Sequence, residues 1–203
     1  MLTIIDYGLG NLNSVTNMIR HVGGTCRVTG DPGELADAEK LILPGVGAFD
    51  RGMEALRGTG IADALSVAVL ERKKPILGIC LGMQLMANRS GEGSLPGLGW
   101  LDAEVRKFCF LAQSELKIPH MGWNTVSIIK TNPLIDSSMG QLRFYFVHSY
   151  HMACTDSADV LATAHHGLDF CAAFQKNNIF GVQFHPEKSH RFGMALMKRF
   201  LEL

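Results

Sequence analysis

The sequence lacks several features that would place it in other classes of protein. It has no apolar run long enough to cross a bilayer, so we expect no membrane partner. Its 19 basic and 19 acidic residues cancel to a formal net charge of zero, so no basic excess favours nucleic-acid binding. The N-terminus has no basic segment and leads directly into an apolar stretch. We therefore expect no signal peptide and a cytoplasmic location.

Cysteine is scarce, and the spacing of the cysteines is not that of a disulfide framework. The five cysteines form no Cys-x-x-Cys pair, and their number is odd. This pattern argues against a set of disulfides and against a zinc site, and it suits a reducing compartment. The cysteines are Cys26, Cys80, Cys109, Cys154 and Cys171.

The length of 203 residues and a hydrophobic content of 47% suit one well-filled α/β domain, which we expect over residues 1–203. In the first half, apolar strand patterns alternate with helical spacings, which predicts βαβ units and a mostly parallel sheet. The expected strands are 2–6, 25–28, 40–43 and 75–79, and the expected helices are 12–22, 49–57, 61–72 and 81–87.

The second half carries short strand patterns with no helices between them, which predicts an antiparallel extension of the sheet. A further strand and a closing amphipathic helix follow, with Ser189 expected as the N-cap of that helix. The expected strands are 105–110, 125–129, 143–147, 159–163, 170–175 and 179–182.

One cysteine stands at a distinctive joint between a strand and a helix. Cys80 ends the apolar run 75–79 and is flanked by Gly78 and Gly82. A glycine two residues before and two residues after a nucleophile is typical of the nucleophile elbow, a sharp turn that exposes the nucleophile at the edge of a sheet. The helix that begins behind Cys80 favours its thiolate. A buried structural cysteine is the alternative interpretation.

A second stretch favours the catalytic interpretation of Cys80. His185 and Glu187 follow the strand 179–182, and in extended backbone two residues at this spacing point the same way. Cysteine, histidine and a carboxylate are the nucleophile, the base and the orienting group of a hydrolytic triad. The sequence therefore predicts Cys80, His185 and Glu187 as catalytic residues.

The turn Pro44–Gly47 follows another predicted parallel strand. It is either a plain strand-to-helix turn or an oxyanion hole, because small residues leave backbone N–H groups bare at the carboxyl edge of the sheet. Both interpretations remain open from these residues alone.

Two rival motifs are weaker. Gly8 and Gly10 follow a strand as in a dinucleotide-binding fingerprint, but Asn13 stands in place of the third glycine, so we expect a tight turn. His148 and His151 do not have the helical spacing of zinc-protease ligands, and neither they nor His185, Glu187 and His190 predict a metal site. We expect no metal and no organic cofactor, with His165 and His166 solvated in a turn.

The cysteine elbow together with His185-Pro186-Glu187 resembles the class I glutamine amidotransferase family. Further stretches resemble, within that family, the glutaminase subunits of imidazole glycerol phosphate synthase. These stretches are 6–12, 44–49, Pro119-His120-Met121-Gly122-Trp123-Asn124, 145–150 and 184–189. The resemblance covers the chain from end to end. It implies a three-layer, flavodoxin-like α/β fold with a mostly parallel central sheet and an antiparallel extension.

The resemblance also implies roles for individual residues. Cys80 attacks the amide of glutamine and forms a thioester, His185 moves the proton, and Glu187 orients the ring. It implies an oxyanion hole at Val46, Gly47 and Leu81, and glutamine-binding residues at Gly45, Gln84, Glu92, His148, Ser149 and Tyr150. It implies a partner-facing surface at Asn11, Trp123, Asn124, Tyr145 and Lys188.

The function that the resemblance implies is hydrolysis of glutamine, with transfer of the ammonia to a (β/α)₈-barrel cyclase subunit in histidine biosynthesis. Two alternatives stay open. A paralogue could supply ammonia to another acceptor, such as a sugar amidotransferase, or the chain could be a stand-alone cysteine hydrolase.

Overall fold

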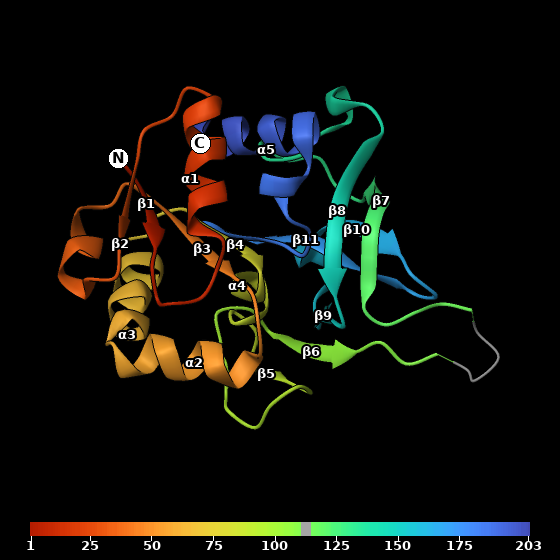
Figure 1. Cartoon of the computed structure of the whole chain (residues 1–203), viewed down its shortest axis with the longest axis horizontal. Coiled ribbons are helices and arrows are strands. Elements are labelled where there is room, and N and C mark those ends of the chain that lie inside the picture. The colour runs from red at the N-terminus through yellow and green to blue at the C-terminus, as the bar shows by residue number, and fades with distance from the viewer. Residues whose placement is uncertain (111–114) are drawn as a thin grey trace.

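A mixed sheet of twelve strands runs through the computed structural model, which describes residues 1–110 and 115–203. One half of this sheet is parallel (Figure 1). Its strands are, in spatial order, β2 (Cys26–Thr29), β1 (Leu2–Ile5), β3 (Lys40–Gly45), β4 (Ile76–Cys80) and β12 (Ile179–Val182). Strand β12 comes from the far end of the chain and inserts beside β4, so both strands end at the same edge of the sheet.

The other half of the sheet is antiparallel, as the sequence predicts. From β12 it continues through β11 (Asp169–Lys176), β10 (Val160–His165), β7 (His120–Ile128) and β8 (Leu142–His148). A side branch consists of β9 (Tyr150–Cys154) and β6 (Ala103–Lys107), which are antiparallel, and the two-residue β5 (Arg89–Ser90), which pairs with β6 in parallel. Strand β9 was not predicted, and β7 begins at His120 rather than at 125. Polar residues interrupt both segments, which hides their strand periodicity.

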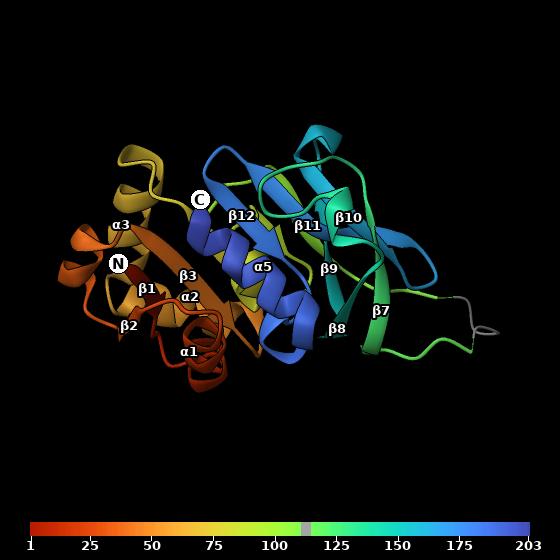
Figure 2. The same cartoon turned by 90° about the horizontal axis from the view of Figure 1, so that it is seen from above.

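Helices cover both faces of the sheet (Figures 1 and 2). Helices α1 (Leu12–His21) and α5 (His190–Glu202) pack together on one face. Helices α2 (Phe49–Gly58) and α3 (Ile61–Ser66) lie on the other face, and α3 continues as a π-helical turn, Val67–Glu71. The short α4 (Leu81–Gln84) follows β4. No helix in the described part of the chain is long and apolar enough to cross a membrane.

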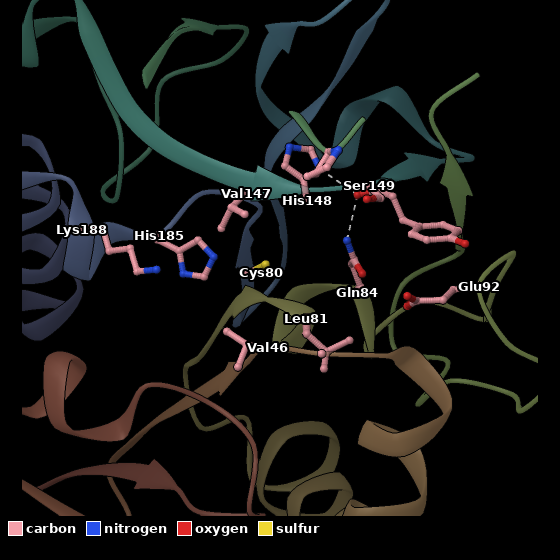
Figure 3. A pocket seen from close by; sticks show the side chains of 13 residues that line it. Val46, Cys80, Leu81, Gln84, Glu92, Val147, His148, Ser149, His185 and Lys188 are labelled. Carbon is pink, nitrogen blue, oxygen red and sulfur yellow. Dashed lines mark hydrogen bonds between the residues drawn. The ribbon is translucent and has the colours of Figure 1, made fainter. Parts of the chain in front are cut away.

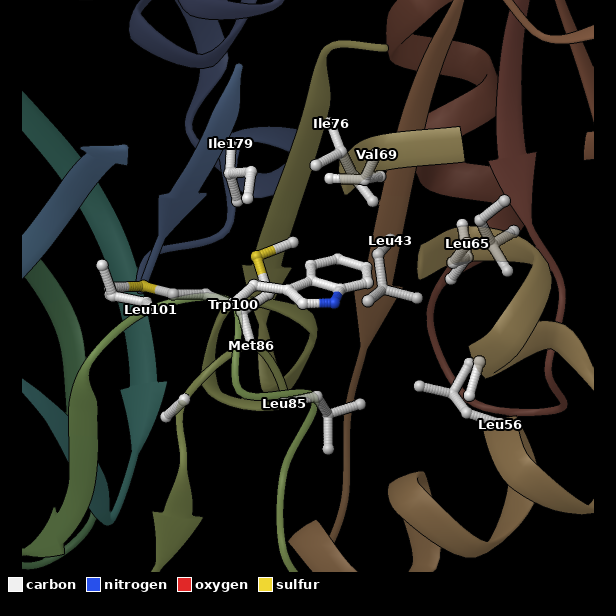
Figure 4. Close-up of a cluster of buried hydrophobic side chains, with 14 of the residues drawn as sticks. Leu43, Leu56, Leu65, Val69, Ile76, Leu85, Met86, Trp100, Leu101 and Ile179 are labelled. Carbon is white, nitrogen blue, oxygen red and sulfur yellow. The ribbon is translucent and has the colours of Figure 1, made fainter. Parts of the chain in front are cut away.

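Alternation along the central strands divides the apolar side chains between two cores. In β3, Leu41 and Leu43 face the layer of α2 and α3, whereas Ile42 faces the layer of α1 and α5. Trp100 and Met86 fill the first of these cores beside Leu43 (Figure 4). The two-sided burial explains why the parallel strands read as continuous apolar runs rather than as alternating ones.

Short 3₁₀ turns complete the path of the chain at Pro32–Asp37, Ser137–Met139, Ser157–Asp159 and Pro186–Lys188. Helix α5 begins directly after Ser189, as predicted, but the predicted capping bond is not formed. Instead, Ser189 Oγ donates to the carbonyl of His185 at 2.6 Å and accepts from the N–H of Tyr145 at 3.0 Å. The hydroxyl thereby ties β8 to the segment that carries His185.

Candidate active site

Cys80 occupies a strained turn between β4 and α4. Its φ of 53° and ψ of −108° lie in a region that residues other than glycine rarely adopt. The flanking glycines are required by space: a Cβ on Gly82 would lie 1.8 Å from the carbonyl oxygen of Leu43. A Cβ on Gly78 would lie 2.7 Å from the backbone nitrogen of Met83. The turn therefore has the geometry of a nucleophile elbow.

His185 and Glu187 lie beside this turn because β12 pairs in parallel with β4, with Val182 opposite Ile79. His185 Nδ1 lies 2.8 Å from Glu187 Oε1, and both side chains are only 2% exposed. His185 Nε2 is buried and has no hydrogen-bond partner among residues 1–110 and 115–203. Glu187 thus holds the His185 ring through Nδ1, and Nε2 can exchange a proton with a reacting group.

The protonation of His185 is set by its two neighbours. Burial by itself would lower the pKa of His185, but the nearby Cys80 sulfur and the hydrogen-bonded, negatively charged Glu187 raise it to about 10. A protonated imidazole next to a thiol stabilises the thiolate, which is the nucleophilic form of cysteine. A nucleophile, a proton carrier and an orienting carboxylate in this order are equipped for nucleophilic acyl transfer.

Cys80 and His185 face a cavity of about 350 Å³ (Figure 3). This volume lies within the range of small-molecule sites, roughly 300–1,000 Å³. Ten of the residues predicted for catalysis, for the oxyanion hole or for glutamine binding line it. They are Val46, Gly47, Cys80, Leu81, Gln84, Glu92, His148, Ser149, Tyr150 and His185. Pro119, Val147 and Lys188 complete the lining.

Gly45, predicted to bind substrate, does not line this cavity. It is buried at the end of β3, opposite Cys80 in the register of β3 and β4. A Cβ on Gly45 would lie 2.4 Å from Tyr7 Oη and 2.8 Å from the backbone nitrogen of Gly82. Gly45 allows the loop Pro44–Gly47 to pass close to the elbow, and its contact with substrate stays a prediction.

The loop that carries Glu92 is tied to the start of α2. Glu92 Oε2 accepts from the backbone N–H of Phe49 at 2.9 Å. Asp50 accepts from the backbone N–H groups of Ser94 and Leu95, and these bonds lower the pKa of its carboxyl group. The Glu92 carboxylate is thus held at the lining of the cavity, while its loop is fixed to the start of α2.

Sequence reasoning missed Gln183, a fully buried amide directly after β12. Its Oε1 accepts from Gln84 Nε2 at 2.9 Å, and its Nε2 lies 3.7 Å from Cys80 Sγ. Gln84 Nε2 also donates to the carbonyl of Tyr150 at 3.0 Å. The available signal was a polar side chain two residues before His185, at the end of an otherwise apolar strand.

The residues predicted to face a partner divide into two groups. Trp123 is 40% exposed and stacks on His190 with ring centroids 5.6 Å apart, while Lys188 lies over the ring of Tyr145 at 5.8 Å. Asn11 directly precedes α1. Asn124 differs, because its amide bonds internally to His120 and to the carbonyl of His165. Its role as a contact with a partner stays a prediction.

No cluster of three or more metal-ligating side chains occurs among the described residues. Gly8 and Gly10 have φ of 81° and 126°, as a tight turn requires. His166, expected to be solvated, instead stacks on His120 with centroids 4.3 Å apart.

Fold and site together define a class: an α/β enzyme with a cysteine at an elbow and a histidine–carboxylate pair at the end of the neighbouring strand. The model of the family "Glutamine amidotransferase class-I" matches residues 3–203, and the chain belongs to that family. It is therefore an enzyme of the glutamine amidotransferase class.

Curated relatives match over the full length of the chain. The protein named "Imidazole glycerol phosphate synthase subunit HisH 2" of Pseudomonas aeruginosa is 48% identical over 203 residues, which is all of both chains. A protein of the same name from Methanococcus maripaludis is 50% identical over 202 residues, covering 100% of this chain and 99% of its own length.

Solved structures with the same fold are more distant in sequence. A structure titled "Crystal structure of glutamine amidotransferase" has a TM-score of 0.76 at 20% identity, covering 98% of this chain and 97% of that chain. A chain of "PurLQS from Thermotoga maritima" has a TM-score of 0.70 at 20% identity, covering 99% and 95%. Identities this low show the fold alone. The fold of these solved structures agrees with the three-layer α/β architecture.

Proposed function

We propose that this chain is the glutaminase subunit of an imidazole glycerol phosphate synthase, which hydrolyses glutamine and passes the ammonia to a cyclase subunit of histidine biosynthesis. One observation carries the chemistry: Cys80 and His185 come from adjacent parallel strands and face one cavity, with Glu187 bonded behind the ring. The full-length relatives named as the HisH subunit support the pathway. We also propose one domain over residues 1–203.

In the first step, the Cys80 thiolate attacks the side-chain amide carbon of glutamine. The oxygen of that amide becomes negative and accepts hydrogen bonds from the backbone N–H groups of Val46 and Leu81, which flank the cavity. The His185 imidazolium gives its Nε2 proton to the departing nitrogen, so that ammonia leaves and a glutamyl thioester remains.

In the second step, the thioester no longer carries the negative sulfur that kept His185 protonated. The neutral ring takes a proton from water at Nε2, and the resulting hydroxide attacks the thioester carbon. The thiolate leaves, glutamate is released, and His185 is protonated again. Glu187 keeps the ring in one orientation through both steps.

We assign binding of the amino-acid end of glutamine to the part of the cavity lined by Glu92. The carboxylate of Glu92 suits the α-ammonium group of an amino acid, because the two charges are opposite. His148, Ser149 and Tyr150 supply backbone and side-chain polar groups to the lining, and the Gln84 amide lies beside them.

The partner is proposed to be a (β/α)₈-barrel cyclase subunit that docks over Asn11, Trp123, Tyr145 and Lys188. An exposed tryptophan beside an exposed lysine that lies over a half-buried tyrosine is typical of an interaction surface. Lys188 also lines the cavity, so this surface reaches the active site. We propose a cytoplasmic location, with five free thiols as its support.

Control by the partner is proposed to act through the loop Pro44–Gly47. Gly47 has φ of 111°, and a Cβ there would meet nothing within 4 Å, so the Val46–Gly47 segment is free of steric restraint on that side. Turning the Val46 N–H away from Cys80 would remove one oxyanion donor, which costs about 10²–10³ in rate. Binding of the partner would favour the productive orientation.

The test is release of glutamate by the chain alone, with the cyclase subunit, and with the cyclase subunit plus its nucleotide ligand. We expect very slow turnover alone and a rise in kcat of at least about 10²-fold in the full mixture, with a smaller change in KM. Cys80→Ala is the control for contaminating glutaminase. A fully active isolated chain would favour the stand-alone hydrolase, and activation by a sugar amidotransferase alone would favour the paralogue.

A further inference from the structure

A row of hydrogen-bonded polar side chains leads from β7 to the wall of the active-site cavity, and the mechanism above does not use its outer half. The row begins at Asn124 and His120 on β7 and continues through His148 at the end of β8. It then reaches the carbonyl of Tyr150, which lines the cavity. All of these groups come from the antiparallel half of the sheet.

The protonation of the row is fixed from its outer end. The backbone N–H of Thr125 donates to Asn124 Oδ1 at 2.8 Å, so the other side of this amide is its NH₂ group. That group donates to the carbonyl of His165 at 2.8 Å and faces His120 Nε2 at 3.1 Å. His120 Nε2 must therefore accept and carries no proton, which leaves the proton of the neutral ring on Nδ1.

The inner end leads independently to the same assignment. The carbonyl of Tyr150 can only accept, so His148 Nδ1, at 2.8 Å, carries a proton and donates it. His148 Nε2 is then the acceptor, and it lies 3.0 Å from His120 Nδ1, the atom already assigned as a donor. Each ring nitrogen in the row is thus either a donor or an acceptor, and each ring holds one proton.

The surroundings keep both rings neutral. His120 and His148 are 5% and 6% exposed and pack among the rings of Phe108, Phe146 and Phe170. Burial lowers the pKa of His120 to about 4 and that of His148 to about 3. The row therefore keeps one pattern of donors and acceptors throughout the neutral pH range.

The inner end of the row determines which way two amides face. Gln84 Nε2 has two hydrogens, and they go to the carbonyl of Tyr150 and to Gln183 Oε1. Because its oxygen is taken as an acceptor, Gln183 must present its NH₂ group to Cys80 Sγ. An N–H directed at the sulfur stabilises a thiolate, whereas an amide oxygen in that place would repel it.

We propose that His120 is a positioning residue for the nucleophile: its Nδ1 proton holds His148, and through the Tyr150 carbonyl and Gln84 it keeps the Gln183 N–H facing Cys80. This inference rests on the proposed function, because the nucleophile it positions is that of glutamine hydrolysis. His120 touches neither substrate nor sulfur, and it acts through the row alone.

Two substitutions at His120 distinguish the effect of its hydrogen bond to His148 from the effect of its packing. His120→Asn places an NH₂ group near the position of Nδ1 and keeps the donor for His148. His120→Gln places its amide near the position of Nε2, where it can bond Asn124 but leaves His148 Nε2 without its donor. His166→Phe is the matched control, because it keeps a ring stacked on His120 and lies outside the row.

In the complex with the cyclase subunit, we expect His120→Gln to lower kcat for glutamine roughly 10- to 100-fold with a smaller change in KM. His120→Asn should recover most of the loss, and His166→Phe should leave kcat nearly unchanged. Equal losses in His120→Asn and His120→Gln would mean that only packing matters, and this would overturn the proposal.

A spectroscopic readout keeps the proposal separate from the proposed function. In ¹⁵N NMR spectra of the isolated chain, His120 and His148 should both appear as the Nδ1–H tautomer near neutral pH, and His148 should keep this form in His120→Asn. Alkylation of Cys80 by iodoacetamide should slow in His120→Gln and not in His166→Phe. An Nε2–H tautomer at His148, or unchanged alkylation, would overturn the proposal even if glutamine is hydrolysed. A wild-type chain that gives these signals but never hydrolyses glutamine would instead refute the proposed function.

Discussion

Replacing Glu187 by glutamine removes a negative charge from beside His185 while nearly preserving the shape of the side chain. Glu187 Oε1 lies 2.8 Å from His185 Nδ1, and glutamine can still accept that hydrogen through its own oxygen. Because both side chains are only 2% exposed, water screens their interaction poorly. The substitution therefore tests how much the charge, as opposed to the hydrogen bond, contributes.

The size of the effect follows from the distance and the burial. An opposite charge this close shifts a pKa by about 1–3 units, and each unit is worth about 1.4 kcal/mol. The pKa of His185, raised to about 10 in the native protein, should therefore fall by that amount in Glu187→Gln. At neutral pH the ring would then lose some of its protonated population, and with it some of the stabilisation of the Cys80 thiolate.

The raised pKa of His185 also makes the free energy of unfolding depend on pH. The pKa of His185 is higher in the folded chain than its ordinary value of 6.5, so protonation stabilises the fold fully below 6.5. This contribution is lost as the pH rises towards about 10. Glu187→Gln should thus lower the free energy of unfolding by about 1.4–4 kcal/mol at pH values below 6.5, and the difference from wild type should shrink as the pH rises.

The assay is urea unfolding of both proteins across this pH range, together with an NMR titration of the His185 ring. Glu54→Gln, at an exposed position of α2, is the control and should show a small difference that does not vary with pH. A Glu187→Gln difference that stayed constant, or grew with rising pH, would refute the charge argument. An unshifted titration of His185 would refute it as well.

Three further predictions concern the elbow and the oxyanion loop. Cys80→Ala should abolish glutamine-dependent synthesis by the complex while ammonium salts still support it, and labelling of another cysteine before Cys80 by a thiol reagent would contradict the assignment. Gly82→Ala should destabilise the chain by more than about 2 kcal/mol in urea unfolding, because its Cβ would overlap the backbone of Leu43. Its matched control is Gly58→Ala in α2, where a Cβ meets nothing within 4 Å and the change should be neutral or slightly stabilising. Gly47→Pro cannot adopt the observed φ of 111°, so it should flatten the response of glutamate release to the cyclase subunit and its ligand; an unchanged response would argue against control at this loop.

The sequence by itself determined the local features of the site. The spacing Gly78-x-Cys80-x-Gly82 after an apolar run predicts the elbow, because only glycine allows such close approach of the flanking backbone. The placement of His185 and Glu187 after a second apolar run predicts their hydrogen bond, because residues two apart in extended chain point the same way. Hydrophobic periodicity likewise predicted the parallel half of the sheet, where strands alternate with helices.

Only the tertiary structure decided which distant residues meet. Gln183 reaches Cys80 across 103 positions because β12 inserts beside β4, and the pairing of distant strands leaves no periodic signal in either strand. The hydrogen bonds of Asn124 also depend on tertiary structure, because the pairing of β7 with β8 and β10 brings its amide to His120 and the carbonyl of His165. Strand order and register depend on contacts between segments far apart in the chain, whereas turns and amphipathic faces depend on neighbours within a few residues.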